Sequence, residues 1–534
     1  MQLRAALPQL MPMPAVGFTR DRPVFRNLGA FMTFLETGGD LVRIREPVST
    51  VLDATEIHRR VIAAAGPVLR FEKPIKLDGS ASDLPLVVNL FGTVGRVAAA
   101  LGAREPCDLS ALGELLASLR QPVPPKGLRD GLARWSELRA ALNGRPEVVR
   151  RAPCQTHVRV GADVDLARLP VQTCWPGEPA PLITWPMAIT RPPDDEDASA
   201  CNLGIYRMQV LGRDRAILRW LPRRGGAAHH QMWRKLGQPM PVAVAIGADP
   251  ALLIAAATPI PETVSEYVYA GALRGARTAL VAARTVPMLV PAEAEIVLEG
   301  WIDPDETAPE GPYGDHTGYY NAVDRFPVMH VSAITHREAP VYLSTFTGRA
   351  PDEPSVLASA LIDVFVPLIR QAFPEVVDCW MPPEACSYRI AVVSLRKAYP
   401  GQARRLMMGF WSLLPQFAMT KMLIVVDDDI DVRNWSDVIW ATATRMDPGR
   451  DLVVVDDTPM DPLDFASPQA GLAGKLGIDA TVKIGPETSR QWGRPLAMPA
   501  ETVSRIERRF GHLFARPTKD EERRDTGRSL LSAE

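Results

Sequence analysis

The sequence predicts a multidomain protein of mixed α/β class, with a β-rich central domain between two α/β domains. The chain has 534 residues, too many for one ordinary core, because domains usually span roughly 100–200 residues. Apolar residues make up 46% of it, which is typical of globular proteins. Helical and strand patterns alternate at both ends, and short strands dominate the middle. We expect an N-terminal α/β domain at 1–140, a central domain at 141–348, a C-terminal α/β domain at 349–515 and a charged tail at 516–534.

The first domain contains clear start and stop signals. Residues 27–46 predict a helix, a stop at Gly38-Gly39 and a strand, with Asn27 as the helix N-cap. Residues 83–93 predict a buried strand, and residues 108–120 an amphipathic helix capped by Asp108. The first 18 residues resemble a signal peptide only weakly, because three prolines interrupt the apolar stretch. We expect an irregular N-terminus.

The central domain has the pattern of many short strands. Residues 206–220 predict two strands around the turn "GRDR", which is a hairpin signal. One helix interrupts the strands at 261–275, with Pro261 in its first turn and Gly275 just past its end. This spacing favours a β-rich domain, with a barrel as one form of it.

The C-terminal domain returns to alternating elements. A long helix is expected at 355–373, and strands rich in β-branched residues at 388–395, 421–430 and 451–457. Helical patterns lie between these strands. Alternation of this kind predicts a parallel sheet with helical crossovers.

Composition excludes several classes of function. The net charge of −2 gives no general attraction for nucleic acid or anionic membrane. The six cysteines form no CxxC pair, so neither a zinc site nor a redox motif is indicated, and we expect reduced cytosolic thiols. No uninterrupted apolar run reaches the ~18 residues of a membrane span, and the nearest, "PVAVAIGADPALLIAAATPIP", is broken by Asp249 and four prolines. We therefore expect a soluble protein.

The stretch "APEGPYGDHTGYYN", residues 308–321, raises the main functional question. Glu310 and Asp315 flank a turn, and two neighbouring carboxylates repel, which raises the pKa of one of them. Such a pair offers a base and a neutral acid in one site. Arg207, in "NLGIYR", can bind a carboxylate with two hydrogen bonds. A solvated glycine-rich loop and a surface arginine are the alternative readings.

Three further segments are candidates for binding. "RWLPRRGG", residues 219–226, combines arginines with glycine amides and fits a phosphate, although it is neither a Walker motif nor GxGxxG. Glu266, within an apolar helix, and Asn202 offer oxygen ligands to a hard divalent cation. Asp427–Asp429 end a predicted strand and could bind Mg²⁺ in a phosphotransferase. Each also fits an ordinary turn, polar face or strand end.

Taken together, these segments resemble the UbiD family of prenylated-flavin decarboxylases. The resemblance covers most of the chain, from about residue 27 to residue 497. It rests on several long blocks in order, including "LPVQTCWPGEPAPLITW", "NLGIYRMQVLG", "RWLPRRGGA", "TPIPETVSEYVYAGALRG", "APEGPYGDHTGYYN" and "TGRAPDEPSVL". Such a series is far more specific than any single motif.

The resemblance implies that the central domain is a split β-barrel like that of flavin reductases. It also implies prenylated FMN as cofactor, with its phosphate held through a divalent ion, usually Mn²⁺ and often with K⁺. Asn202 and Glu266 fall on the family's metal ligands. The third ligand stays open, since Arg223 stands near the place where some members have histidine and His229 and His230 come later. The cofactor-contacting segments are Ile205, Tyr206 and Arg207; Arg219, Trp220 and Leu221; and Arg224 and Gly225.

The activity implied is non-oxidative decarboxylation of 4-hydroxy-3-polyprenylbenzoate to 2-polyprenylphenol, as in ubiquinone biosynthesis. Arg207 would orient the carboxylate in a network with Glu310, and Asp315 would protonate the ring carbon. For Asp315 to be neutral at pH 7, its pKa should be raised by burial and by Glu310. The alternatives are a relative acting on another hydroxyarene acid, a flavin-storage scaffold without activity, and the phosphotransferase on Asp427–Asp429.

Partners and location follow from the same resemblance. We expect a small aromatic acid as substrate, a flavin prenyltransferase as supplier of the cofactor, and a dimer or hexamer. No nucleic-acid partner is expected. The expected location is the cytoplasm, and because a polyprenyl substrate lies in the bilayer, peripheral contact with the inner membrane is also considered.

Overall fold

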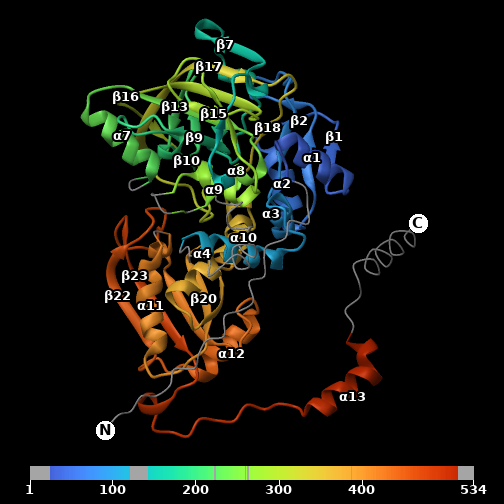
Figure 1. Cartoon of the computed structure of the whole chain (residues 1–534), viewed down its shortest axis with the longest axis vertical. Coiled ribbons are helices and arrows are strands. Elements are labelled where there is room, and N and C mark those ends of the chain that lie inside the picture. The colour runs from blue at the N-terminus through green and yellow to red at the C-terminus, as the bar shows by residue number, and fades with distance from the viewer. Residues whose placement is uncertain are drawn as a thin grey trace, which may run out of the picture. The chain divides into compact units, whose positions relative to one another are not determined.

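The computed structural model describes residues 24–120, 142–221, 224–258, 260, 264–386, 388–414 and 416–514 (Figure 1). The predicted irregular N-terminus and the whole of the predicted tail, 516–534, lie outside these residues. Residues up to Thr481 form one compact unit, and residues from Val482 onward form a second. The first unit contains all five of the sheets described below.

The N-terminal helix forms for the reasons that the sequence gives. The side chain of Asn27 accepts a hydrogen bond from the Ala30 amide, and Gly38 is the C-cap. Asp108, by contrast, directs its carboxylate backward to the amides of Arg104 and Glu105, so it does not cap the following helix as predicted. The elements are α1 (Leu28–Thr37), β1 (Leu41–Ile44), β2 (Val48–Ser49), α2 (Asp53–Ala63), β3 (Val68–Phe71), β4 (Pro74–Ile75), β5 (Leu86–Val88), α3 (Val94–Ala100) and α4 (Leu109–Arg120).

Two small sheets hold this part of the chain. Strands β1, β3 and β5 form a sheet whose fourth strand is β18 (Tyr342–Leu343), which pairs with β5 in parallel. Strands β2 and β4 form a two-stranded sheet. The pairing of β18 with β5 ties the segment that follows the central sheet to the N-terminal elements.

The central region is built on a nine-stranded sheet. Its order is β10-β9-β13-β16-β17-β12-β11-β8, with β7 paired to β17, and neighbouring strands are antiparallel. The predicted hairpin is confirmed, because β11 and β12 pair around the "GRDR" turn. The strands are β7 (His157–Val160), β8 (Leu182–Ile183), β9 (Pro186–Thr190), β10 (Asn202–Ile205), β11 (Met208–Val210), β12 (Arg215–Leu218), β13 (Met240–Ile246), β16 (Ile296–Glu310) and β17 (Asp324–His336).

Three helices accompany this sheet. They are α7 (Gly225–Lys235), α8 (Pro250–Ala257) and α9 (Glu266–Arg274). Helix α9 starts five residues later than predicted, because the hydroxyl of Ser265 caps it. It ends as predicted, with Gly275 in the left-handed conformation at φ 71°. A small sheet of β6 (Glu147–Val148), β14 (Ala279–Ala282) and β15 (Leu289–Pro291) completes the region.

The C-terminal region contains a five-stranded sheet of order β19-β20-β21-β23-β22. Its three central strands are parallel, as predicted, but both edge strands are antiparallel, so the sheet is mixed. The sequence prediction missed β19 and β23. The elements are β19 (Val376–Trp380), β20 (Ile390–Leu395), α11 (Gln402–Leu413), β21 (Met422–Asp427), α12 (Trp435–Arg445), β22 (Leu452–Pro459) and β23 (Leu472–Ala480).

Helix α10 (Glu353–Ala372) packs against α4 and is part of the main hydrophobic core (Figure 1). Among the described residues it is the one helix long and apolar enough to cross a membrane, but most of it is buried in the protein. Its first residue, Glu353, is buried beside His58, with the carboxylate 3.6 Å from the imidazole Nε2. We therefore interpret α10 as a core helix.

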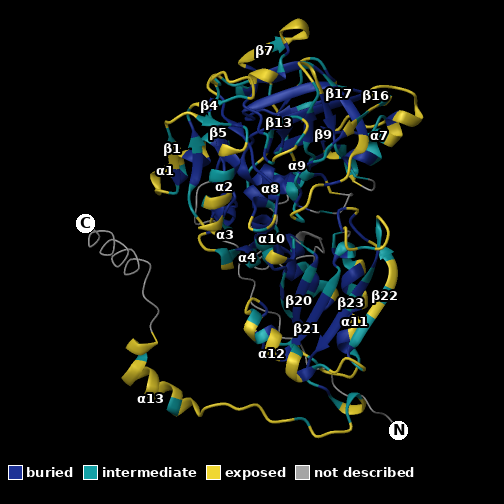
Figure 2. Cartoon of the chain, turned by 180° about the vertical axis from the view of Figure 1, so that it is seen from behind, coloured by how far each residue is buried: buried dark blue, intermediate teal, exposed yellow. Residues whose placement is uncertain are grey.

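The burial pattern follows these sheets. Figure 2 shows β20 and β21 buried, and α13 (Ala500–Phe510), in the second unit, largely exposed.

Candidate active site

Arg207 lies in the two-residue link between β10 and β11. The Arg219 amide donates to the carbonyl of Arg207 at 3.2 Å, which extends the pairing of β11 with β12 by one step. Two arginines that are twelve residues apart in sequence are therefore neighbours at one end of the hairpin. Both side chains are mostly buried, with 12% and 11% exposed.

Glu310 is the last residue of β16, and the segment after it folds back toward β17. The Asp315 amide donates to the carbonyl of Tyr319 at 3.1 Å, and the Asn321 amide to that of Tyr313 at 3.0 Å. Gly318 has a φ of +80°, which favours glycine in this turn. These bonds hold the predicted loop in a fixed form, with Glu310 and Asp315 both buried.

The structure brings together the three residues predicted as catalytic. The Nε of Arg207 is 2.7 Å from Glu310 Oε1, and one terminal nitrogen is 2.6 Å from Asp315 Oδ2. The other terminal nitrogen donates to Glu310 Oε2 at 3.2 Å. One guanidinium therefore bridges both acids, which excludes the alternative of a solvated loop.

Two further residues belong to this network and were not assigned to it from the sequence. Asn321 Oδ1 accepts from Arg207 at 2.8 Å and from the Tyr313 amide at 2.8 Å. Arg219, predicted to bind the cofactor, lies 3.5 Å from both Glu310 and Asp315. Its buried Nε has no hydrogen-bond partner. Asn321 closes the same quoted stretch as the acids, which is the one signal that could have revealed it.

The predicted rise in the pKa of Asp315 is wrong. Burial by itself raises this pKa, but the His316 hydrogen bond and the positive charges of Arg207, His316 and Arg219 together hold the pKa of Asp315 well below its usual range. The prediction considered only burial and Glu310, and it left out the cations that the fold gathers around the carboxylate. Asp315 is therefore ionised at neutral pH in this arrangement.

The candidate metal ligands Asn202 and Glu266 also lie close together. Glu266, at the start of α9, accepts from the amide of Leu203, the residue after Asn202, at 2.9 Å. Burial raises the pKa of Glu266 to about 7. A buried carboxylate of this kind is stabilised by a bound cation. The amide nitrogen of Asn202 donates to the hydroxyl of Tyr206 at 3.3 Å.

Other predicted residues have different surroundings. Trp220 is buried and packs edge-on against Tyr206, with ring centroids 6.0 Å apart. Leu221 packs against a small apolar cluster, and Ile205 ends β10. Arg223 lies outside the described residues. His229 faces the Thr190 hydroxyl at 3.0 Å, so its Nδ1 is engaged.

The aspartates of the phosphotransferase alternative do not form an open metal site. Arg445 binds both Asp427 and Asp429, with nitrogen–oxygen distances of 2.6 Å to each. The Arg445 guanidinium therefore already binds two of the carboxylates that would have held Mg²⁺. This geometry argues against that alternative.

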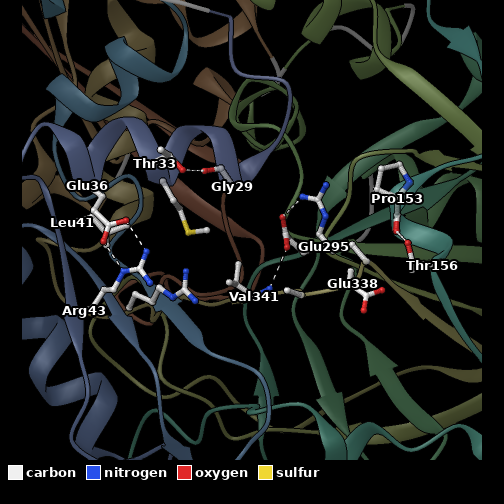
Figure 3. A pocket seen from close by; sticks show the side chains of 14 residues that line it. Gly29, Thr33, Glu36, Leu41, Arg43, Pro153, Thr156, Glu295, Glu338 and Val341 are labelled. Carbon is white, nitrogen blue, oxygen red and sulfur yellow. Dashed lines mark hydrogen bonds and ion pairs between the residues drawn. The ribbon is translucent and has the colours of Figure 1, made fainter.

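A cavity of about 400 Å³ lies elsewhere, lined by residues of α1, β1 and the segment after β17 (Figure 3). Figure 3 shows Arg43 paired with Glu36, and the carboxylate of Glu295 pairs with Arg337 at 2.8 Å. It contains none of the residues predicted for catalysis or cofactor binding.

Comparison with known proteins identifies this arrangement. Three family models match the chain: the 3-octaprenyl-4-hydroxybenzoate carboxy-lyase N-terminal domain at residues 32–116, the Rift-related domain at 147–350 and the C-terminal domain at 355–480. The chain belongs to the UbiD family. As a UbiD-type enzyme it is a decarboxylase, that is, a carboxy-lyase, of mixed α/β multidomain fold.

Solved UbiD-class structures share this fold. HmfF from Pelotomaculum thermopropionicum, in complex with FMN, is 30% identical, with 88% of this chain and 97% of that chain covered and a TM-score of 0.72. Vanillic acid decarboxylase from Sedimentibacter hydroxybenzoicus, in closed form, is 26% identical, with 92% and 100% covered and a TM-score of 0.78. At 21% identity, the apo 3,4-dihydroxybenzoic acid decarboxylase AroY of Klebsiella pneumoniae supports the fold alone, with 92% and 100% covered and a TM-score of 0.72.

The residues around Asn202 fit the flavin of a UbiD enzyme. Helix α7 begins at Gly225, and the side chain of its N-cap residue Arg224 makes no capping hydrogen bond, so the N-terminus of the helix can face a phosphate. The Gly226 amide donates to the Tyr206 hydroxyl at 3.3 Å. Arg224 precedes it, and Asn202 and Glu266 lie nearby on β10 and α9. A Cβ at Gly225 would lie 1.9 Å from Asn202 Oδ1, so the absence of a side chain there leaves room for the asparagine.

Substitution of Gly225 is therefore expected to weaken cofactor binding without unfolding the protein. In Gly225→Ala, the new methyl group would displace the Asn202 side chain, which can swing away because it is a short flexible group. We expect at least a tenfold increase in the Kd for the flavin, the range reported for loss of groups that orient metal ligands. Fluorescence titration with FMN and Mn²⁺ measures it.

Gly212→Ala is the matched control, because a Cβ there would meet nothing within 4 Å. An unchanged Kd in Gly225→Ala would show that Asn202 does not take part in cofactor binding.

Proposed function

We propose that this UbiD enzyme decarboxylates 4-hydroxy-3-polyprenylbenzoate to 2-polyprenylphenol, a step of ubiquinone biosynthesis, with prenylated FMN as cofactor. The observation that carries the decarboxylase assignment is the Arg207 guanidinium, which bridges the buried carboxylates of Glu310 and Asp315. Loss of CO₂ from an aromatic ring needs a bound carboxylate and a proton at the same carbon. This triad supplies a cation for the first and an acid for the second.

Each side chain has a distinct task. Glu310 fixes the guanidinium of Arg207, and Arg207 orients the substrate carboxylate. When that carboxylate binds, it competes with Asp315 for Arg207, which weakens one cause of the low pKa of Asp315. Asp315 then delivers a proton to the ring carbon. Prenylated FMN, when bound, supplies the electron sink that side chains lack.

The cofactor phosphate is proposed to be held through Mn²⁺, with K⁺ as a second cation. Asn202 and Glu266 would supply oxygen ligands to the cation, and a water or phosphate oxygen would complete the set. The buried carboxylate of Glu266 and the N-terminus of α7, where the Arg224 side chain makes no capping hydrogen bond, support this arrangement. The nine-stranded sheet that carries these residues is proposed to form the split β-barrel of flavin reductases.

Two observations support a polyprenyl tail on the substrate. The description of all three matching family models, 3-octaprenyl-4-hydroxybenzoate carboxy-lyase, supports it. A pair of exposed aromatic side chains beside the loop of Glu310 and Asp315 also supports the tail. Tyr319 and Phe465 are 68% and 55% exposed, and their ring centroids lie 6.3 Å apart. Exposed apolar groups of this kind mark binding surfaces when they cluster.

The second candidate is decarboxylation of another hydroxyarene acid. Structures of vanillic acid decarboxylase and of 3,4-dihydroxybenzoic acid decarboxylases share the fold, and neither of these substrates carries a prenyl tail. The site geometry around Arg207 serves both candidates equally.

A two-part experiment tests the proposal. The protein is co-expressed with a flavin prenyltransferase, which we propose as its cofactor supplier, and the bound flavin is weighed by mass spectrometry. A mass above FMN by a dimethylallyl unit is expected, whereas plain FMN or no flavin would favour a storage scaffold. CO₂ release is then measured on 4-hydroxybenzoates with and without prenyl chains, on vanillate and on 3,4-dihydroxybenzoate. Preference for an unprenylated acid would assign the enzyme to the second candidate.

We propose a homodimer or homohexamer in the cytoplasm, with peripheral contact at the inner membrane, because a polyprenyl substrate is supplied from the bilayer.

A further inference from the structure

In the proposed reaction, Asp315 must be reprotonated in every turnover. Decarboxylation of an aromatic carboxylate replaces CO₂ by H⁺, so one proton enters the site per product. Asp315 is only 6% exposed. Its neighbours Arg207 and Arg219 cannot supply a proton, because guanidinium groups stay protonated in proteins. Another group has to bring the proton to this buried carboxylate.

His316 is placed to do so. Its Nδ1 lies 2.8 Å from Asp315 Oδ1, and its side chain is 15% exposed. On its other side, Nε2 lies 3.7 Å from Oδ2 of Asp461, in the segment between β22 and β23. The imidazole thus stands between two carboxylates, an arrangement that favours its protonated form.

Asp461 is itself held in position. The hydroxyl of Tyr388 donates to Asp461 Oδ2 at 2.7 Å, and the Leu463 amide donates to Oδ1 at 3.0 Å. The rings of Tyr388 and His316 lie 6.0 Å apart. Tyr388 and Asp461, from the C-terminal sheet region, therefore lie on one side of the His316 imidazole, and Asp315, from the central region, lies on the other side.

We propose that His316 is the proton supplier of Asp315 and that Asp461 is a positioning residue that keeps His316 charged. This inference rests on the proposed decarboxylase function. The Nδ1–H bond of the imidazolium breaks, its electron pair stays on nitrogen, and an O–H bond forms at Asp315. Asp315 passes a proton to the ring carbon that has lost CO₂ and returns to the carboxylate. The neutral imidazole then takes up one proton from solvent.

The charges around His316 agree with this role. Burial lowers the pKa of His316, but the hydrogen bond to Asp315 and the charges of Asp315 and Asp461 outweigh burial and raise it above the usual value. Arg389, whose guanidinium lies 3.5 Å from Asp461, acts in the opposite direction. Asp352, the N-cap of α10, also lies within electrostatic reach of His316. The carboxylates outnumber the guanidinium on this side.

The test compares the pH dependence of kcat in two matched variants. Asp461→Asn removes the charge that faces Nε2, while the amide oxygen can still accept from Leu463. The control is Asp464→Asn in the same segment, where the carboxylate pairs with Lys421 at 2.9 Å and with Arg389 at 3.3 Å.

The proposed proton transfer needs a protonated His316. The value of kcat should therefore fall as the pH rises through the pKa of His316 in the substrate complex, which gives the pH profile an alkaline limb. In Asp461→Asn this alkaline limb is expected to move to lower pH by about one unit. At acidic pH the variant should turn over within about threefold of the wild-type rate, and Asp464→Asn should keep the wild-type limb. Two results in Asp461→Asn would overturn the proposal: an equal loss of kcat at every pH, or an alkaline limb at the same pH as in the wild type. Either result indicates a purely structural role.

A second measurement does not depend on turnover. Nitrogen NMR of histidine-labelled protein follows the His316 imidazole, assigned by its absence in His316→Gln. We expect titration above the ordinary value of about 6.5 in the wild type, a lower value in Asp461→Asn and no change in Asp464→Asn. Titration of wild-type His316 at or below 6.5 would contradict the assignment.

The two proposals fail in different ways. If no hydroxybenzoate releases CO₂, the proposed function is wrong. The proposed role of His316 as proton supplier is then wrong as well, even if the NMR shift is observed. If CO₂ is released but the limb and the NMR titration do not respond to Asp461→Asn, only the role of His316 and Asp461 fails.

Discussion

An Asp315→Asn enzyme is expected to bind its flavin normally and to release CO₂ about 10³-fold more slowly than the wild type, within the range of 10²–10⁴ for loss of a general acid. The amide has nearly the same shape as the carboxylic acid but cannot donate the acidic proton. Its oxygen can still accept from Arg207, which donates to Asp315 at 2.6 Å in the wild type. The substrate carboxylate should therefore still bind, and the loss should lie in kcat.

The matched control for Asp315→Asn is Asp324→Asn at the start of β17. The Asp324 side chain is exposed and accepts a hydrogen bond from the adjacent Arg325 amide at 2.7 Å. We expect its kcat to stay within about twofold of the wild type. A rate within tenfold of the wild type in Asp315→Asn, with flavin bound, would remove Asp315 from the role of proton donor.

Replacement of Arg207 by leucine is expected to be the most destabilising change in the site. It leaves Glu310, which is fully buried, and Asp315 without the guanidinium that bridges them. Breaking a buried ion pair by removing one partner costs about 3–5 kcal/mol. We expect a markedly lower midpoint of thermal or urea denaturation and no measurable decarboxylation. Arg215→Leu on β12 is the control, because its pair with Glu306 at 3.8 Å is half exposed and contributes little.

The same variant should show a distinctive pH dependence. In the wild type the pKa of Asp315 is lowered in the folded state, so its ionisation stabilises the fold above the unfolded pKa of about 3.9 and this stability is lost as the pH falls through the folded value. Without Arg207 the folded pKa rises and the stabilisation shrinks. The stability deficit of Arg207→Leu relative to the wild type should therefore be largest at neutral pH and smaller near pH 4. A deficit independent of pH would point to lost packing rather than lost charge.

Local signals in the sequence were sufficient where the chain interacts with itself over short distances. Asn27 and the two glycines after the first helix set its ends, and the "GRDR" turn set the pairing of β11 with β12. The start of α9 was placed too early, because the cap is Ser265. Strand β23, "LAGKLGIDA", was missed because it has few β-branched residues and is specified by its pairing with β21 and β22.

The candidate site divides in the same way. The residues Arg207, Glu310 and Asp315 were selected from their motifs, and the fold brings them into contact. The ionisation state of Asp315, by contrast, could not be predicted from the motifs. A pKa depends on every charge within several ångströms, and Arg207 and Arg219 come from segments about 100 residues away along the chain.

By itself, the sequence determined the family, the mixed α/β class and the catalytic candidates Arg207, Glu310 and Asp315. These depend on the identity of the residues and on their order. The tertiary structure alone decided that Asp315 is ionised rather than neutral, that Arg445 occupies the acidic cluster of Asp427 and Asp429, and that His316 lies between two carboxylates. The physical reason is that electrostatic energies depend on distance in space and on burial. The order of residues along the chain specifies both only through the complete fold.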